Sequence, residues 1–174
     1  MTHPNRPMLP PLELGARLDR MLGCAERLVA PLSIRALDHE LSDGTGSVRD
    51  LAFRVFRLGL AYVDGMDMGE LSGEWLREAA PPDLVDGASV ARYGALVRGR
   101  VSGWFEGAGP AEYGRTITTS GGPQNGLALL ERIAGGAAEH LRQLHAVAVE
   151  LGSTPQDPLP ISDFQGLPLR AGLW

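Results

Sequence analysis

The chain has 174 residues, of which 44% are apolar and 21% charged, the proportions of an ordinary globular domain. Its net charge of -5, with no block of basic residues, argues against nucleic-acid binding, because that affinity comes largely from neutralising phosphates. The sequence has no apolar run long enough to span a membrane. Its N-terminal stretch lacks the features of a signal peptide, and the single Cys24 excludes an internal disulfide. We therefore expect a cytoplasmic protein.

The N-terminal part of the chain predicts an arm, a helix and a loop. Residues 1–9 are expected to form a flexible arm. Leucines at spacings of three and four then predict an amphipathic helix over 11–30, with prolines suited to its first turn. The stretch "DHELSDGTGS" at 38–47 is rich in turn-forming residues and predicts a loop.

A second long helix is expected after this loop. Ser47 and Asp50 have the spacing of a capping box, and the apolar stripe that follows predicts a helix over 48–66. A short helix is expected over 71–79, ended by the proline pair that begins at Pro81.

Two more long helices are predicted in the second half. The first covers 88–106, with Ser89 as its N-cap. The segment "RTITT" is extended in character and precedes a glycine-rich turn, and the last helix covers 124–151. The proline-rich tail at 152–174 is expected to pack on the bundle through Leu159, Phe164, Leu167 and Trp174.

This pattern predicts an all-α fold. Four long amphipathic helices indicate a four-helix bundle with one short extra helix and an irregular C-terminal tail, in a single domain over 1–174. The long connection between the second and last helices means that a simple up-down-up-down order is not guaranteed.

Four residues within the expected helices are unusual. Arg54 lies on the stripe of the second helix and His140 on that of the last, and a buried guanidinium costs several kcal/mol unless it is paired or solvated. Gly135 and Gly136 stand in the middle of the last helix, where each costs about 0.5–1 kcal/mol relative to alanine. Each has an ordinary structural explanation. His140 could be a core histidine with its hydrogen bonds satisfied, and Arg54 could extend along its alkyl chain to solvent. The two glycines could allow close packing between helices. Taken together they indicate one internal cavity in the bundle.

Three segments resemble the bacterial DinB/YfiT-like family: "SVRDLAFRVFRLGLAYVD" at 47–64, "GPQNGLALLERIAGGAAEHLRQL" at 122–144, and the ending "DFQGLPLRAGLW". The resemblance implies a four-helix bundle, often dimeric. Many members bind a divalent metal through three histidines, one from the second helix and an H-x-x-x-H pair from the last. Several act with a low-molecular-weight thiol such as mycothiol or bacillithiol.

At the metal site this chain departs from the family pattern. The second-helix ligand position is Arg54, the first histidine of the pair is Gly136, and only His140 matches. The aromatic residue that usually precedes the pair is Gly135. Because a guanidinium also repels a dication, we expect no metal and no cofactor, although a small thiol stays possible. In this interpretation the glycines enlarge the cavity and Arg54 replaces the charge of the metal.

The first functional interpretation is a metal-independent enzyme that acts on a small organic molecule in specialised metabolism. A guanidinium facing His140 would lower the pKa of the imidazole, so that neutral His140 acts as general base. Arg54 would hold a carboxylate or an enolate, for an isomerisation, cyclisation or elimination. His39, where the family has a tryptophan, would add a second acid or base. The substrate pocket would be lined by Arg54, Gly135, Gly136, Tyr62, Tyr93 and Trp104.

Two alternatives remain open at this stage. The protein could bind a small molecule without catalysis, with Arg54 as an anion clamp. It could also be a thiol-dependent transferase or isomerase with an altered metal site that recruits Glu139 or His39. Glu139 adjoins His140 and therefore points elsewhere on the helix, which argues against this third possibility.

Overall fold

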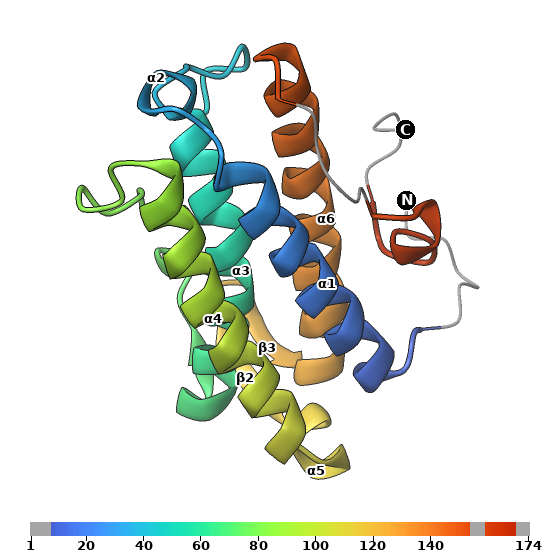
Figure 1. The fold of residues 1–174 in the computed structure, drawn as a ribbon. Coiled ribbons are helices and arrows are strands. Elements are labelled where there is room, and N and C mark those ends of the chain that lie inside the picture. Colours follow the sequence, from blue (N-terminus) through green and yellow to red (C-terminus); the bar gives the residue numbers. More distant parts are fainter. Residues whose placement is uncertain (1–7, 154–158, 170–174) are drawn as a thin grey trace.

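The computed structural model describes residues 8–153 and 159–169. Its body is a bundle of four long helices, in agreement with the all-α prediction (Figure 1). Most of the predicted arm at 1–9, and Trp174 of the predicted tail, lie outside the described residues. The four bundle helices are α1 (Pro11–Val29), α3 (Val48–Met68), α4 (Gly87–Gly107) and α6 (Gly126–Glu150).

The bundle helices form a ring in which each packs against two neighbours, in the order α1, α4, α3, α6. In Figure 1, α1 and α6 run upward and α3 and α4 downward, so that α3 and α6 are antiparallel neighbours. The order is therefore up-down-down-up, which the long connection between α3 and α4 permits. The core is made of the apolar stripes that the sequence displays, and its largest fully buried side chains include Tyr62, Phe53 and Phe56.

Capping residues set the ends of these helices. The predicted capping box at the start of α3 is confirmed: Ser47 Oγ accepts from the Asp50 amide at 3.2 Å, and Asp50 Oδ2 accepts from the Ser47 amide at 3.0 Å. The prediction of Ser89 as N-cap of α4 is wrong. Asp86 is the N-cap and Ser89 is its partner three residues into the helix, because the carboxylate accepts from the Ser89 amide at 2.7 Å.

The predicted helix over 71–79 is also largely wrong. Only a short 3-10 turn, η1 (Trp75–Arg77), forms there. The reason is a side chain from the bundle, since Arg57 Nε donates to the Trp75 carbonyl at 3.0 Å and pairs with Glu78 at 2.9 Å. These contacts hold the segment around Trp75–Arg77 against α3.

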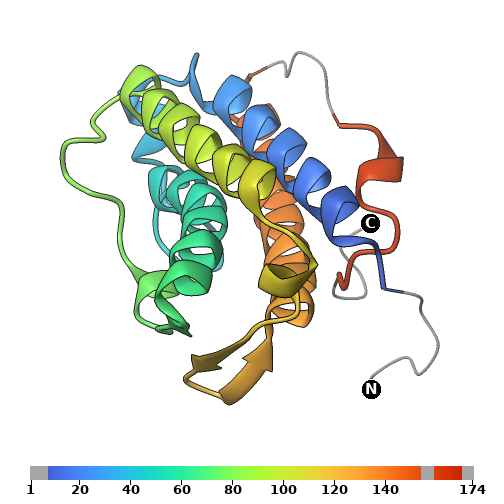
Figure 2. The same ribbon diagram turned by 90° about the horizontal axis from the view of Figure 1, so that it is seen from below.

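A small sheet lies at the lower end of the bundle, and Figure 2 shows its hairpin from below. The extended character predicted for "RTITT" is confirmed, but residues 122–125 form a strand, so the last helix begins at Gly126 and not at 124 as expected. Thr116 pairs with Asn125 in the antiparallel hairpin, and Asn125 then caps α6 by accepting from the Leu127 amide at 3.0 Å. The short elements are α2 (Ile34–Leu37), β1 (Glu70–Leu71), α5 (Pro110–Tyr113), β2 (Thr116–Thr119), β3 (Gly122–Asn125) and η2 (Ile161–Asp163).

In the described part of the tail, Phe164 and Leu167 are buried against the bundle, and half-buried Leu159 packs beside them. Its polar anchor is Asp163, whose carboxylate pairs with Arg20 of α1 at 2.7 Å. Among the described residues, no helix is both long and apolar enough to cross a membrane.

Candidate functional site

Arg54 and His140, the two principal predicted site residues, lie at the same height along the interface between α3 and α6, which is called the seam below. A Cβ built on Gly136 would lie 3.4 Å from Leu58 Cδ1, so these two residues face each other across the seam. Arg54 lies one turn before Leu58, and His140 lies one turn after Gly136. The two helices are antiparallel neighbours (Figure 1). Arg54 and His140 therefore lie at the same height along the two helices, one turn from the Leu58–Gly136 contact.

The guanidinium of Arg54 turns toward the loop that precedes α3. Its Nη2 donates to the carbonyl oxygen of Thr45. The side chain is half-buried, and the carboxylates of Asp43 and Asp50 lie close enough for its charge to lower their pKa values. Arg54 starts from an apolar stripe, but its side chain extends to polar groups at the end of the bundle. The desolvation cost of its charge is thereby reduced.

The loop at 38–47 is tied to both helices of the seam. Asp43 accepts from Thr45 Oγ1 at 2.6 Å and, through its other oxygen, from Gln143 Nε2 of α6 at 3.0 Å. The Thr45 hydroxyl is the main cause that lowers the pKa of the Asp43 carboxyl. With the bond from Arg54, these contacts close the loop over this end of the seam.

Asp50 holds the other side of the same loop. Burial raises the pKa of its carboxyl, but hydrogen bonds from Ser47 and from the Ala80 amide outweigh burial and leave the pKa below its ordinary value. The carboxylate is therefore ionised at neutral pH and offsets the charge of Arg54.

The two histidines of the predicted site lie in different surroundings. His140 is half-buried on α6. His39 is exposed in the loop, where its backbone carbonyl accepts from the Val48 amide at 3.0 Å. The expectation that His39 adds a second acid or base inside the bundle is therefore not supported by its position.

The glycine pair makes room for close packing, in contrast to the enlarged cavity predicted from the sequence. A Cβ on Gly135 would lie 2.8 Å from Pro168 Cγ and 3.0 Å from the Pro168 carbonyl oxygen, so the tail already occupies that side of α6. On the other side, Leu58 fills the space beside Gly136. The two glycines therefore serve two different contacts, one to the tail and one to α3.

These contacts predict opposite effects for the same substitution at adjacent positions. Gly135→Ala should destabilise the protein by about 1–2 kcal/mol, because overpacking against the Pro168 backbone exceeds the gain in helix propensity. Gly136→Ala should stabilise it by about 0.5–1 kcal/mol, because 3.4 Å is an ordinary contact distance for the added methyl group. Urea unfolding of both variants measures the two changes. Stabilisation by both would mean that the tail does not rest on Gly135.

The three predicted aromatic residues lie mainly between α3 and α4. Tyr93 contacts Phe53, with ring centroids 5.3 Å apart, and Tyr62 contacts Trp104 at 5.5 Å. Tyr62 is fully buried, burial raises the pKa of its hydroxyl, and that hydroxyl has no hydrogen-bond partner among the described residues. Tyr62 is a core residue, and the half-buried Tyr93 and Trp104 pack against the core. Tyr93 also contacts Phe56, with ring centroids 6.2 Å apart.

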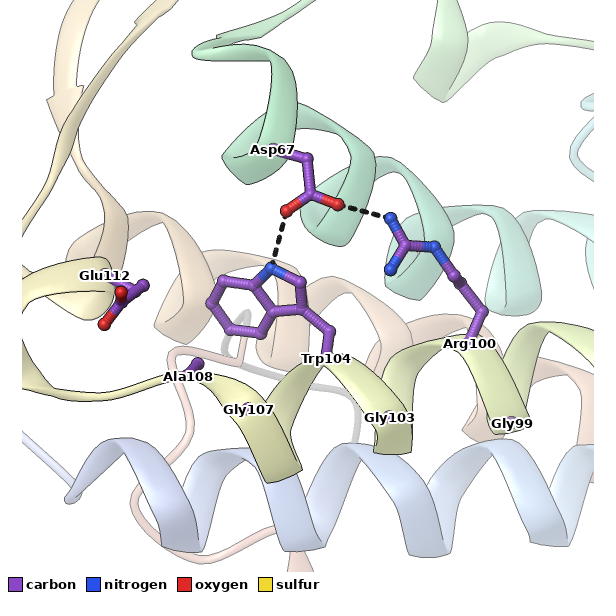
Figure 3. Close-up of a pocket in the computed structure, with 8 residues that line it drawn as sticks. All are labelled: Asp67, Gly99, Arg100, Gly103, Trp104, Gly107, Ala108 and Glu112. Carbon is purple, nitrogen blue, oxygen red and sulfur yellow. Dashed lines mark hydrogen bonds and ion pairs between the residues drawn. The ribbon is translucent and has the colours of Figure 1, made fainter.

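Trp104 also lines an open groove of about 580 Å³ on the outside of the bundle, which sequence reasoning missed (Figure 3). Its indole nitrogen donates to Asp67 Oδ1 at 3.0 Å, and Arg100 binds the other oxygen of the same carboxylate. The Arg100 hydrogen bond is the main reason that the pKa of the Asp67 carboxyl is lowered. The polar groups of the groove thus satisfy one another, and the sequence gives no signal for a contact between residues 33 positions apart.

The residues at the family's metal position do not fit a metal ion. Of the three positions, Arg54 carries a guanidinium bound to the Thr45 carbonyl, and Gly136 has no side chain. His140 is then the single residue of the three that could bind a metal. Within residues 8–153 and 159–169, no three His, Cys, Asp or Glu side chains are grouped so that they could hold a metal. Four further residues surround Arg54 and His140, and their spacing in the sequence did not indicate them: Asp43, Thr45, Leu58 and Gln143.

Comparison with known proteins bears on the architecture. The sequence matches no protein-family model and no curated protein. The crystal structure of a DinB-like protein from Bacillus subtilis, YjoA, matches with a TM-score of 0.66 over 84% of this chain and 96% of that chain, at 14% sequence identity. The chain has a DinB-like fold. At this identity the likeness shows the fold alone, so the chemistry of this DinB-like bundle rests on its own residues.

Proposed function

We propose that this protein is an enzyme that acts on a small organic molecule by acid–base chemistry at the loop-covered end of the α3–α6 seam. His140 is the proton acceptor and Arg54 holds the negative charge that develops on the substrate. The observation that carries the proposal is the register set by Leu58 and Gly136, which brings these two residues to one level of the seam.

The chemical roles follow from the groups present. A neutral imidazole that removes a proton beside a carbonyl leaves an electron pair that moves to the carbonyl oxygen as an enolate. A guanidinium beside that oxygen stabilises the enolate. In a β,γ-unsaturated carbonyl substrate the enolate is conjugated with the double bond, so return of the proton to the γ-carbon completes an isomerisation. In the structure the guanidinium is held by the Thr45 carbonyl, so a substrate would exchange that bond for its own anionic oxygen.

A second candidate is binding without turnover, in which Arg54 exchanges its bond to the Thr45 carbonyl for an anionic group of the ligand. An anion clamp needs only to bind, whereas catalysis needs His140 as well. The two candidates therefore differ in what they require of His140.

A native mass spectrum of gently purified protein tests the proposal first. We expect an organic adduct and no stoichiometric metal. The adduct should be lost in Arg54→Ala and retained in His39→Ala, a matched control on the exposed part of the loop. A stoichiometric metal adduct on the unaltered protein would contradict the proposal.

The compound released from the adduct then separates the two candidates. Incubated with the protein in D₂O, it should exchange a carbon-bound hydrogen for deuterium, because His140 removes and returns that proton. His140→Ala should abolish the exchange. Binding with no exchange in the unaltered protein would favour the second candidate.

A further inference from the structure

The loop that covers the end of the seam has a fixed base and an exposed tip. At the base, Leu41 is buried and its amide donates to the Gly46 carbonyl at 2.8 Å. The tip, residues 42–45, is exposed. Among the described residues, two hydrogen bonds join this tip to the bundle helices, one from Gln143 of α6 and one from Arg54 of α3. The position of the tip therefore depends on these two bonds.

The two bonds are linked to each other through a single turn of the loop. Asp43 accepts from Gln143 Nε2 at 3.0 Å through one carboxylate oxygen, and from the Thr45 amide at 3.0 Å and the Thr45 hydroxyl at 2.6 Å through the other. The Thr45 carbonyl in turn accepts from the guanidinium of Arg54. Gln143 lies three residues after His140, on a neighbouring turn of α6. This chain of bonds thus connects the helix that carries His140 to the side chain of Arg54.

We propose that the hydrogen bond from Gln143 to Asp43 is a latch that controls access to Arg54. While the latch is closed, the tip covers this end of the seam, and the Thr45 carbonyl holds the guanidinium. When the latch opens, the tip moves away and the guanidinium is free to bind an anionic group of the substrate. Gln143 is then a positioning residue that acts on Arg54 through the loop. The inference rests on the proposed function, since access to Arg54 matters only where Arg54 binds the substrate.

The geometry of the tip suits a movement of this kind. Gly44 and Gly46 have φ angles of 71° and 116°, in the left-handed region that favours glycine. A Cβ built on Gly44 would meet no atom within 4 Å, so this part of the tip projects into open space. The latch is one exposed hydrogen bond, and its loss shifts the ratio of closed to open loop by about fivefold. A substrate supplies an effect of this size with one charge-assisted hydrogen bond to Arg54.

Hydrogen exchange followed by NMR tests the latch with no ligand present. In Gln143→Leu and in Gln143→Glu, the amides of Gly44 and Thr45 should exchange at least about fivefold faster than in the unaltered protein. Leucine cannot donate a hydrogen bond, and an ionised glutamate repels the Asp43 carboxylate. The matched control is Gln124→Glu in β3, at the other end of the bundle, which should leave both rates unchanged.

A double variant shows whether the bond itself is responsible. Asp43→Asn alone should keep the latch closed, because the asparagine amide can donate to the oxygen of a turned Gln143 amide. Combined with Gln143→Glu, it should restore slow exchange, because the asparagine then donates to the glutamate carboxylate. The latch is re-formed with its donor and acceptor exchanged.

Modification of arginine by phenylglyoxal measures whether the latch controls Arg54. Peptide mass spectrometry gives the rate of modification at Arg54, and exposed Arg35 in the same sample serves as the internal reference. The rate at Arg54 should rise about fivefold in Gln143→Leu, because the open loop no longer holds the guanidinium. In the variant that combines Asp43→Asn with Gln143→Glu, it should return to the rate of the unaltered protein.

Three results would each overturn the inference. The first is equal exchange of the loop amides in Gln143→Glu and in the unaltered protein. The second is faster exchange of the loop with no change in the modification of Arg54. The third is no recovery in the double variant, although urea unfolding shows unchanged stability. None of these measurements uses a substrate, so they separate a failure of the latch from a failure of the proposed function, which the adduct and the deuterium exchange test.

Discussion

Gly87→Ala should destabilise the protein by about 3 kcal/mol, although alanine is the better helix former. Gly87 is the first residue of α4, and a Cβ there would lie 2.3 Å from the Val29 carbonyl oxygen and 2.8 Å from those of Ala30 and Leu32. These atoms are backbone, so they cannot turn aside as a long side chain does. The start of α4 must move away from the end of α1, which exposes part of the core.

This close approach has a physical cause. The last carbonyl groups of α1 carry partial negative charge and the first turn of α4 carries partial positive charge, so the two helix ends attract each other. Only a residue without a side chain allows the contact. Gly87 lies just before the helix expected over 88–106, and no local pattern indicates this contact, because the clashing atoms come from a segment almost sixty residues earlier in the chain.

Thermal and urea unfolding at low protein concentration measures the effect. Gly99→Ala, the same change in the middle of the same helix, is the matched control. It should stabilise the monomer by about 0.5–1 kcal/mol, because the added methyl group meets open space. Equal melting temperatures for the two variants would mean that α4 does not begin against the end of α1.

The triple variant Arg54→His, Leu58→Ala and Gly136→His should bind one divalent metal ion, with zinc affinity in the micromolar range or tighter. Histidines at 136 and 140 lie four residues apart on one face, and a histidine at 54 would stand at the level of His140 across the seam. The structure adds the change at Leu58, because an imidazole at 136 needs the space that this side chain fills.

Titration with zinc, followed by native mass spectrometry, measures the expected stoichiometry of one. The matched control keeps Arg54 and carries only Leu58→Ala and Gly136→His. It should bind far more weakly, because a guanidinium replaces one ligand and repels the ion. A folded triple variant that binds no metal would show that the register of α3 and α6 differs from the one described.

The long helices could be predicted from the sequence because their signals are local. The leucine spacing of α1 and the capping box at Ser47 and Asp50 act within a few residues, and the structure confirms both. The helix expected over 71–79 failed for a non-local reason, since Arg57 takes the carbonyl of Trp75 that a helix would have used. The strand at 122–125 likewise depends on its partner β2.

The candidate site was predictable only in part. Residue types and helical periodicity singled out Arg54 and His140, and the antiparallel seam places them at one level. The direction of the Arg54 side chain could not be predicted, because it depends on the Thr45 carbonyl in a loop whose path is set by Asp43 and Gln143. The packing contact of Gly135 could not be predicted either, because Pro168 belongs to the C-terminal tail, far from Gly135 in the sequence.

The sequence by itself determined the four amphipathic helices, the capping box of α3 and the unusual residues on the apolar stripes, because each of these follows from spacings of three or four residues. Only the tertiary structure decided what each unusual residue touches. Gly135 and Gly87 admit backbone from distant segments, and Arg54 extends to a loop carbonyl. Such contacts depend on distances between segments far apart in the chain, which no local pattern encodes.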